Sequence, residues 1–435
     1  MSRTWTLRKH KPSGTRGRGA EGQVAGRPSP AAERRRGGPR EHGEQGAFAS
    51  FARRFRSGEL GSVPVVLGLV VVWIIFETLN KNFLSPRNLS NLSVDIVGTG
   101  LIAIGIVFVL LLGEIDLSVG SVSGLAAAAF AVLNVNQGMS EGLAVLVAVL
   151  AGTAIGAVQG FFFAKVGVPA FVVTLAGLLG WNGLMLYILG TSGTINLDDK
   201  GLVAMLTGHY FTDIAAAYGL AALGTAGYFL ASYRDTRRRR AAGVPARPLR
   251  ETLIRTAVLA AITLGAAYVL NQFQGLPLAL LIFLIFLVGL DYVLRRTPYG
   301  RMIFALGGSV EAARRTGLNV GLVRISVFMI SGTMAAIGGL FLASRVTSAS
   351  QSSGSGNLLM DAIAAAVIGG TSMFGGRGRT WSALLGVLVI QSIASGVALM
   401  GIQTAVQFMI TGGVLLIAVV IDSLSRRAQK AHGRV

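Results

Sequence analysis

The stretch Tyr299–Gly321, Y-G-R-M-I-F-A-L-G-G-S-V-E-A-A-R-R-T-G-L-N-V-G, is a polar island between two long apolar runs. The runs are Leu276–Leu294 and Val323–Ala343, and each is long enough to cross a bilayer as a helix. Lipid leaves no place for unsatisfied backbone groups, so the polar residues between two such runs should lie at the membrane surface. The sequence therefore predicts two spans joined by a connector with structure of its own.

The island contains signals that start and stop a short helix. In order these are a chain break at Gly307-Gly308, an N-cap at Ser309, an acidic first turn with Glu311, a basic last turn with Arg314 and Arg315, and Gly317, which can take the left-handed conformation. Such a helix has about two turns, whereas isolated helices need roughly 12–15 residues to persist in water. We expect either the membrane surface or a partner's groove to hold it.

The segment F-A-L-G-G-S-V-E-A-A-R-R-T-G-L-N-V resembles the cytoplasmic coupling loop of ATP-binding-cassette sugar importer permeases, in the branch that serves ribose, xylose and galactose. In that family the E-A-A…G segment docks into a cleft on the ATP-hydrolysing subunit. The family more often has Asn where this chain has Ser309, which can form the same cap. The resemblance implies that Ala313, a small residue, lies on the face that approaches the partner. The residues it assigns to coupling are Ser309, Glu311, Ala312, Ala313, Arg314 and Gly317.

The composition is that of an integral membrane protein. Of the 435 residues 52% are hydrophobic and only 13% are charged, and the mean hydropathy is +0.63. The chain has no cysteine, which excludes disulfides and thiolate metal sites. We therefore expect an all-α fold, a polytopic transmembrane helix bundle of about 10–12 membrane segments.

Twelve apolar segments follow a polar N-terminal region. They are Val63–Leu79, Ser93–Leu112, Leu117–Val135, Leu143–Lys165, Ala170–Leu189, Phe211–Ala231, Leu253–Leu270, Leu276–Leu294, Val323–Ala343, Leu358–Phe374, Trp381–Met400 and Ala405–Ile421. Leu358–Phe374 is short and ends in glycines, so it can be a re-entrant or broken helix that reduces the number of full crossings.

Positive charge predicts the orientation. With the N-terminus inside, 35 of the 39 Lys and Arg residues fall in cytoplasmic segments. Only Lys81, Arg87, Lys200 and Arg345 remain outside. This assignment places both termini and the Ser309–Gly317 helix in the cytoplasm of a multi-pass cell-membrane protein.

The segments group into a domain plan. Residues 1–60 have 14 Lys or Arg against 5 Glu and little apolar pattern, which predicts a disordered cytoplasmic arm that lipid attracts more readily than nucleic acid. The plan continues with a front transmembrane half (61–231), a basic cytoplasmic linker (232–254), a rear transmembrane half (255–423, with the coupling loop 295–322) and a basic tail (424–435). We expect the basic linker mainly to anchor the topology. A long basic insert followed by an extra helical pair also resembles the xylose-type permeases.

Two glycine-rich hairpins resemble each other and should both point inward. The first, Gly113–Ser121, contains Asp116, Ser118 and Ser121, and the second is Gly369–Arg379. Acidic groups near membrane depth are costly and often functional. Asp116 is equally well suited to capping the third helix, and this alternative stays open.

The hairpin sequences also resemble the permease family. G-E-I-D-L-S-V-G-S is similar to its I-D-L-S-V-G signature, and the segment from Leu358 to Gly378 is similar to its D-A-I-A-A-x-x-x-G-G-T-S-x-x-G-G-x-G block. The implied substrate-pathway or gate residues are Asp116, Ser118, Ser121, Asp361, Thr371 and Ser372. Because sugars are neutral, a path also needs amides and aromatics; Asn134 and Asn182 are further candidates, with Gln159, Tyr187, Gln391 and Gln403 beside them, although helix packing explains each equally well.

The predicted function is transport without catalysis. No G-x-x-x-x-G-K-[ST] loop and no serine–histidine pair occur in the apolar segments, so no enzyme, cofactor or metal site is expected, and a partner subunit would bind ATP. The resemblance implies a sugar importer permease, for a pentose such as xylose, with a second permease copy or paralogue, two ATP-binding subunits and an extracytoplasmic sugar-binding protein. An ion-gradient-driven secondary sugar transporter is the alternative, and a passive channel comes third.

Overall fold

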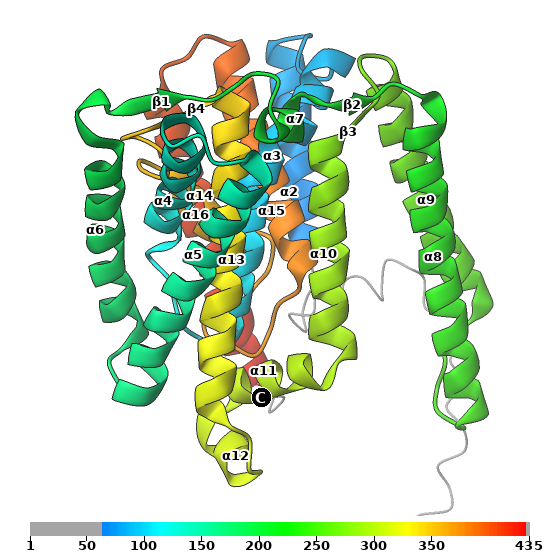
Figure 1. Cartoon of the computed structure of the whole chain (residues 1–435). Coiled ribbons are helices and arrows are strands. Elements are labelled where there is room, and N and C mark those ends of the chain that lie inside the picture. Colours follow the sequence, from blue (N-terminus) through cyan, green and yellow to red (C-terminus); the bar gives the residue numbers. More distant parts are fainter. Residues whose placement is uncertain (1–62, 432–435) are drawn as a thin grey trace, which may run out of the picture. The chain divides into compact units, whose positions relative to one another are not determined.

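A computed structural model describes residues 63–431 as a helix bundle with four short strands (Figure 1). The predicted disordered arm, residues 1–60, lies outside the described residues. Of the predicted tail, 424–435, only the backbone as far as Ala431 is described. The disorder of the arm and the role of the tail therefore stay predictions.

Twelve helices or helical runs correspond to the predicted apolar segments. They are α2 (Val63–Leu79), α3 (Pro86–Leu111), α4 (Val119–Ala131) with η2 (Val132–Asn136), α5 (Glu141–Phe161) with η3 (Phe162–Val166), α6 (Ala170–Leu189) with η4 (Gly190–Ser192), α8 (Ile214–Ala241), α9 (Leu249–Asn271), α10 (Leu278–Arg296), α13 (Val320–Val346), α14 (Leu358–Ile368), α15 (Thr380–Leu399) and α16 (Thr404–Ala431). In the described part of the chain, nine of these runs are long and apolar enough to span a membrane, and α2, α14 and the apolar part of α16 are shorter. The predicted all-α polytopic membrane bundle is confirmed.

The broken segment is also confirmed. Helix α14 stops at Ile368, and the chain continues without helix to Thr380. A Cβ on Gly369 would overlap the Ser382 carbonyl oxygen, so the chain turns hard against the start of α15 there. In this non-helical stretch Gly369, Thr371 and Ser372 are buried, whereas Phe374, Arg377 and Arg379 are exposed.

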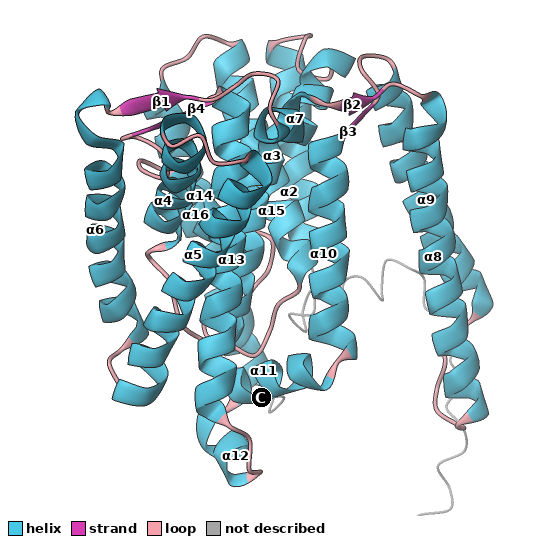
Figure 2. Ribbon diagram, in the orientation of Figure 1, coloured by secondary structure: helices cyan, strands magenta, loops and turns pink. Residues whose placement is uncertain are grey.

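Several elements were not predicted. Helices α7 (Leu202–Gly208) and α11 (Pro298–Gly308) lie in connections, and four two- or three-residue strands pair antiparallel. The pairs are β1 (Thr194–Asn196) with β4 (Ser348–Ser350), and β2 (Tyr210–Phe211) with β3 (Leu276–Pro277). All four strands lie at the end of the bundle opposite α12 (Val310–Arg315), as Figure 2 shows.

The middle of the chain departs from the predicted domain plan. Helix α8 continues through Arg240 to Ala241, so most of the basic residues assigned to the linker are helical, and only residues 242–248 separate α8 from α9. The predicted front and rear halves also interlock. Helix α13, from the rear half, packs most extensively against α5, α3 and α4, which belong to the front half.

Glycines bring α13 into backbone contact with α5. A Cβ on Gly156 would overlap the Phe328 carbonyl oxygen, and one on Gly332 would overlap the Gly152 carbonyl oxygen. Small residues are the usual means of close helix packing in membranes, where the hydrophobic effect does not drive helices together. Helix α13 therefore has a fixed place in the bundle.

This packing predicts different effects for two alanine substitutions on α5. Gly156→Ala should force α5 and α13 apart and lower the thermal unfolding midpoint of the purified protein, because overpacking typically costs about 1–3 kcal/mol. Gly142→Ala is the matched control, since no atom lies within 4 Å of its added Cβ, and it should leave the midpoint unchanged or raise it slightly. Equal midpoints for the two variants would contradict the backbone contact.

Candidate functional site

The short helix α12 has the predicted caps. The Ala312 N–H donates to Ser309 Oγ over 3.3 Å, and Glu311 lies in the first turn. At the other end Arg314 and Arg315 lie in the last turn, and Gly317 has a φ of 80°. The left-handed glycine lets the Leu318 N–H turn back to the Ala313 carbonyl oxygen, 3.3 Å away. The helix is thus capped locally at both ends although it is only 6 residues long.

Two details of the prediction are wrong. Gly307-Gly308 do not break the chain, because they are the last residues of α11, and the chain leaves the helix at Ser309. Ala313 does not lie on the exposed face, since it is only 3% exposed and packs within the hydrophobic core of its own chain. With one face turned inward, the helix leaves Glu311, Ala312 and Arg315 exposed.

On the side before α12, Gly307 touches the second hairpin and the end of α3, which leads into the first hairpin. In the structure the first hairpin is shorter than the predicted Gly113–Ser121, and we use the name for Leu112–Ser118, between α3 and α4; the second hairpin is Gly369–Arg379, between α14 and α15. The Gly376 N–H of the second hairpin donates to the carbonyl oxygen of Leu111, the last residue of α3, over 2.9 Å. A Cβ on Gly307 would overlap that oxygen and lie 2.7 Å from the Gly376 nitrogen. The end of α11, the second hairpin and the end of α3 therefore meet at one point.

On the side after α12, α13 contacts the first hairpin through a buried carboxylate. Ser331 Oγ, on α13, donates to Asp116 Oδ2 over 2.8 Å. Asp116 Oδ1 accepts from the Ser118 N–H at 2.9 Å and from Ser118 Oγ at 2.6 Å. Asp116 is 2% exposed. Burial raises the pKa of its carboxyl group, and the hydrogen bonds from Ser118 and Ser331 oppose that rise.

The capping alternative for Asp116 is therefore wrong. Helix α4 begins at Val119, and its N-cap residue is Ser118. Asp116 lies two residues before this N-cap, and its Oδ1 accepts from the Ser118 N–H. Its second oxygen leaves the hairpin altogether to reach Ser331, which is 215 residues away in sequence. Asp116 ties the first hairpin to α13.

A second, electrostatic link runs parallel to this one. Burial raises the pKa of Glu114 in the first hairpin, and the charge of Arg324, in the first turns of α13, opposes that rise. The Arg324 guanidinium carbon lies 4.3 Å from the centre of the Phe163 ring, which fixes the arginine by a cation–π contact. Helix α13 thus bonds to Asp116 directly and acts on Glu114 through charge.

The remaining predicted hairpin residues also lie in this region. Ser121 Oγ donates to the Ser118 carbonyl oxygen over 2.9 Å, and Ser118 Oγ lies 3.0 Å from Gln159 Oε1 on α5. In the second hairpin, Ser372 Oγ accepts from the Phe374 N–H over 3.3 Å, and the buried Thr371 Oγ1 has no partner among the described residues. Both hairpins are therefore internally bonded.

Other predicted pathway residues are not brought to this site. Asn134 donates to the Met139 carbonyl oxygen in the α4–α5 connection, and the half-buried Asp361 lies in the first turn of α14. Helix α14 begins soon after β4, so Asp361 belongs to the end of the bundle that holds the strands, opposite α12 (Figure 1). Asn182 is half-buried on α6 and Tyr187 is 83% exposed. Gln391 lies 3.5 Å from Thr99 and is better explained by helix packing.

Three contributors were missed in the sequence: Gly307 as a contact point, Arg324 and Ser331. Gly307 carried a signal that was interpreted only as a chain break. Arg324 is one of several arginines near this surface, and Ser331 is one serine in an apolar run, so neither differs from its neighbours in the sequence. The site connects α12 with both hairpins. Helix α11, which precedes α12, contacts the second hairpin and the end of α3, and α13, which follows α12, contacts the first hairpin.

Comparison with known proteins identifies the family of this bundle. Residues 88–419 match the family described as branched-chain amino acid transport system / permease component. The chain belongs to this family of permeases. Two similar proteins are the xylose transport system permease proteins of Escherichia coli (strain K12), 37% identical over 368 residues that cover 84% of this chain and 92% of the relative, and of Haemophilus influenzae, 33% identical over 375 residues that cover 86% and 99%. The ribose import permease protein of Bacillus subtilis is 33% identical over 365 residues, 84% of this chain and 94% of the relative.

The permease family supports the resemblance stated from the sequence. Its match covers both hairpins and the α11–α13 region, so the contacts around α12 belong to the shared part of the chain. No solved structure matches the chain.

The two-sided binding of Asp116 predicts the effect of Asp116→Asn in the permease. Asparagine keeps one oxygen and replaces the other with an NH₂ group, so either Ser118 or Ser331 faces a donor instead of an acceptor, at a cost of about 1–3 kcal/mol. We expect substrate uptake to fall severalfold while expression and membrane insertion stay normal. Asp95→Asn is the control, because Asp95 pairs with Arg345 over 2.8 Å in a half-exposed ion pair, and such pairs contribute little. Uptake assays on both variants test this prediction. If Asp116→Asn takes up substrate as fast as the wild type, the Asp116 carboxylate does not belong to the functional site.

Proposed function

We propose that this permease is the membrane subunit of an ATP-binding-cassette importer for a small sugar, and that the sugar is a pentose such as xylose. The relatives named as xylose and ribose permeases support the substrate class. The observation that carries the mechanism is the attachment of α12 on both sides, through α11 to the second hairpin and the end of α3, and through α13 to the first hairpin. The ion-gradient alternative receives no support from these relatives, which are components of named transport and import systems.

In the proposed mechanism an ATP-hydrolysing subunit binds the exposed face of α12. A shift of α12 displaces the end of α11, and Gly307 transmits this displacement to Leu111 and Gly376 because no side chain separates them. The same shift acts on α13, which carries Ser331 and therefore Asp116. The two hairpins respond together, and they form the gate of the sugar path at this end of the bundle. The serine and threonine hydroxyls of the hairpins suit a neutral, polyhydroxylated substrate.

The proposal includes the partners and the location. The permease pairs with a second copy of itself or a paralogue, binds two ATP-binding subunits that hold the ATP, and receives sugar from an extracytoplasmic binding protein. It needs no cofactor of its own. It lies in the cell membrane with both termini and α12 in the cytoplasm. The positive charges that favour this orientation include eight arginines between residues 234 and 255, which belong to the ends of α8 and α9 and the link between them.

Neighbouring alanines of α12 provide a matched test of docking. Ala312→Arg places a large charge on the exposed face, so it should leave the fold intact but abolish binding of the ATP-hydrolysing subunit and ATP-driven uptake. Ala313→Arg forces a charge into the core and should instead lower stability and expression, because an unpaired buried charge is costly. The measurements are pull-down of the ATP-binding subunit, sugar-stimulated ATP hydrolysis and thermal unfolding. If Ala312→Arg binds and couples like the wild type, α12 is a connector and not a docking helix.

The orientation can be tested with single cysteines, since the chain has none. Ala242→Cys, in the exposed link after α8, should resist an impermeant thiol reagent in intact cells and react after the membrane is opened. Gln137→Cys, in the exposed connection between α4 and α5, should react in intact cells. The reverse pattern would place α12 on the outer surface and contradict the proposed coupling.

A further inference from the structure

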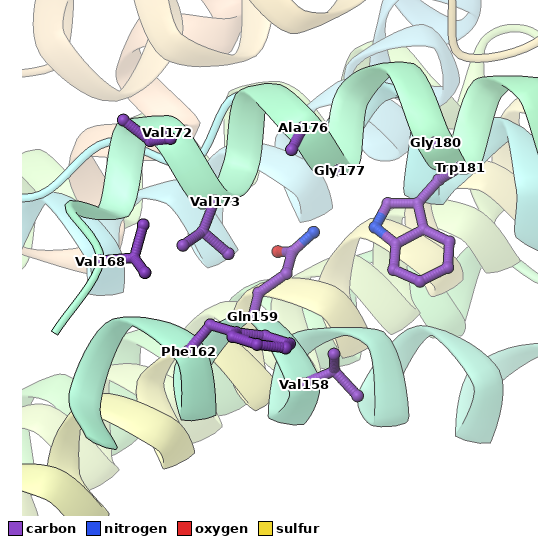
Figure 3. Close-up of a pocket in the computed structure, with 10 residues that line it drawn as sticks. All are labelled: Val158, Gln159, Phe162, Val168, Val172, Val173, Ala176, Gly177, Gly180 and Trp181. Carbon is purple, nitrogen blue, oxygen red and sulfur yellow. The ribbon is translucent and has the colours of Figure 1, made fainter. Parts of the chain in front are cut away.

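A buried amide connects α5 and α6 to the first hairpin. It belongs to Gln159 on α5, which is 3% exposed, and its Oε1 lies 3.0 Å from the hydroxyl oxygen of Ser118. Its other end reaches toward α6, where the indole nitrogen of Trp181 is turned toward it (Figure 3). Gln159 Nε2 and Trp181 Nε1 lie 2.4 and 3.0 Å from the point where a Cβ on Gly177 would stand. The amide therefore lies between the serine of the hairpin and the tryptophan of α6.

The hydroxyl group of Ser118 determines the orientation of this amide. A hydroxyl has one hydrogen to donate, and Ser118 Oγ donates it to Asp116 Oδ1 over 2.6 Å. An amide oxygen beside Ser118 Oγ then faces a second acceptor with no hydrogen between them. In the same orientation Gln159 Nε2 and Trp181 Nε1 are two buried donors that have no acceptor among the described residues. This arrangement leaves three groups unsatisfied, and buried groups without partners are costly.

Half a turn of the amide pairs both donors. Gln159 Nε2 then donates to Ser118 Oγ, and Oε1 comes to the place beside Trp181 Nε1 and accepts its hydrogen. The oxygen and nitrogen of an amide have nearly the same shape, so their hydrogen-bond partners assign them. The hydrogen bonds then run in one direction, from Trp181 through Gln159 and Ser118 to Asp116.

Helix α6 has a second contact with the first hairpin. Thr174 Oγ1, on α6, lies 3.4 Å from the Ile115 carbonyl oxygen. Elsewhere α6 packs mainly on α4, and Leu179 on its outer side is 70% exposed. The hairpin is thus bonded to a helix at the edge of the bundle (Figure 1) as well as to α13.

We infer that Gln159 and Trp181 are positioning residues of the gate, which act on Asp116 through Ser118. The amide donates to Ser118 Oγ, so the hydroxyl hydrogen is directed to the carboxylate, and the indole N–H keeps the amide from turning back. Asp116 is then held from two sides, by α13 through Ser331 and by α5 and α6 through Ser118. This inference rests on the proposed role of Asp116 in the gate.

The direction of the hydrogen bonds can be measured by NMR at the Trp181 indole N–H. The full-length permease is purified with isotope-labelled tryptophan, and Trp181→Phe identifies the signal of Trp181 among those of the 4 tryptophans. Gln159→Glu keeps an acceptor beside the indole, and Gln159→Met keeps the length of the side chain without one. We expect the signal at a downfield, hydrogen-bonded position in the wild type and in Gln159→Glu, and an upfield shift in Gln159→Met. A signal that Gln159→Met leaves in place, or that moves downfield only in Gln159→Glu, contradicts the inference.

Uptake assays test whether these bonds act on the gate. Trp181→Phe removes the N–H but keeps an aromatic ring, and should lower uptake roughly threefold to tenfold, as the loss of one buried hydrogen bond predicts. Added to Gln159→Met, it should lower uptake no further, because residues of one hydrogen-bond chain have non-additive effects. Trp73→Phe is the matched control, since Trp73 Nε1 donates to Ser392 Oγ over 2.9 Å, outside this chain, and it should leave uptake unchanged. Wild-type uptake by Trp181→Phe, or losses that add in the double variant, would overturn the positioning role.

Two glycines of α6 supply a steric pair. Gly177→Ala places a methyl group 2.4 Å from Gln159 Nε2, so the flexible amide end must move away from Trp181, and both the NMR signal and the uptake should resemble those of Gln159→Met. Gly180→Ala, whose Cβ has no atom within 4 Å, should match the wild type in both measurements. If the two variants behave alike, the amide does not need this place. Wild-type uptake by Asp116→Asn would instead contradict the proposed gate, and the Trp181 signal would still decide the direction of the hydrogen bonds.

Discussion

The direct contact of α13 with the backbones of its neighbours is the constraint on which the rest of the bundle depends. Glycines allow it on three sides: Gly332 against α5, Gly338 against Gly98 on α3, and Gly339 against the Ser123 carbonyl oxygen of α4. Lipid contributes no hydrophobic force between helices, so this close packing supplies the attraction. Because α13 cannot drift from α3 and α4, Ser331 stays within reach of Asp116, and a buried carboxylate can be held by hydrogen bonds instead of by a cation.

Much of the fold followed from hydropathy alone. Apolar runs of spanning length are a strong signal, and one of them, Ala170–Leu189, agrees with helix α6 to the residue. Capping chemistry located α12 for the same reason, since Ser309 and Gly317 are residues with specific backbone roles. Helix α11 was missed because its aromatic and apolar residues lie at an interface, where no long apolar run distinguishes it.

The site was only partly predictable, because its contacts join distant parts of the chain. The motifs around Asp116 and Thr371 marked the two hairpins, but nothing in the sequence indicated that Gly307 lies between them. The burial of Ala313 was predicted incorrectly because a two-turn helix carries too few residues to reveal which face packs inward. Ser331 could be recognised only from the structure, because its partner, Asp116, lies 215 residues away in the sequence.

The pairing of β2 with β3 makes the α8–α9 hairpin a module. Phe211 and Leu276 are direct partners in that pairing, so the chain leaves the bundle and returns to it at neighbouring positions. The hairpin also has a small core of its own, formed by Ala217, Ala221, Ala267 and Leu270 together with Leu276. A gene could gain or lose the 64 residues between these two strand positions without rerouting any other helix. Permeases that differ by one helical pair can thus share the same transport core, with the extra pair added at its edge.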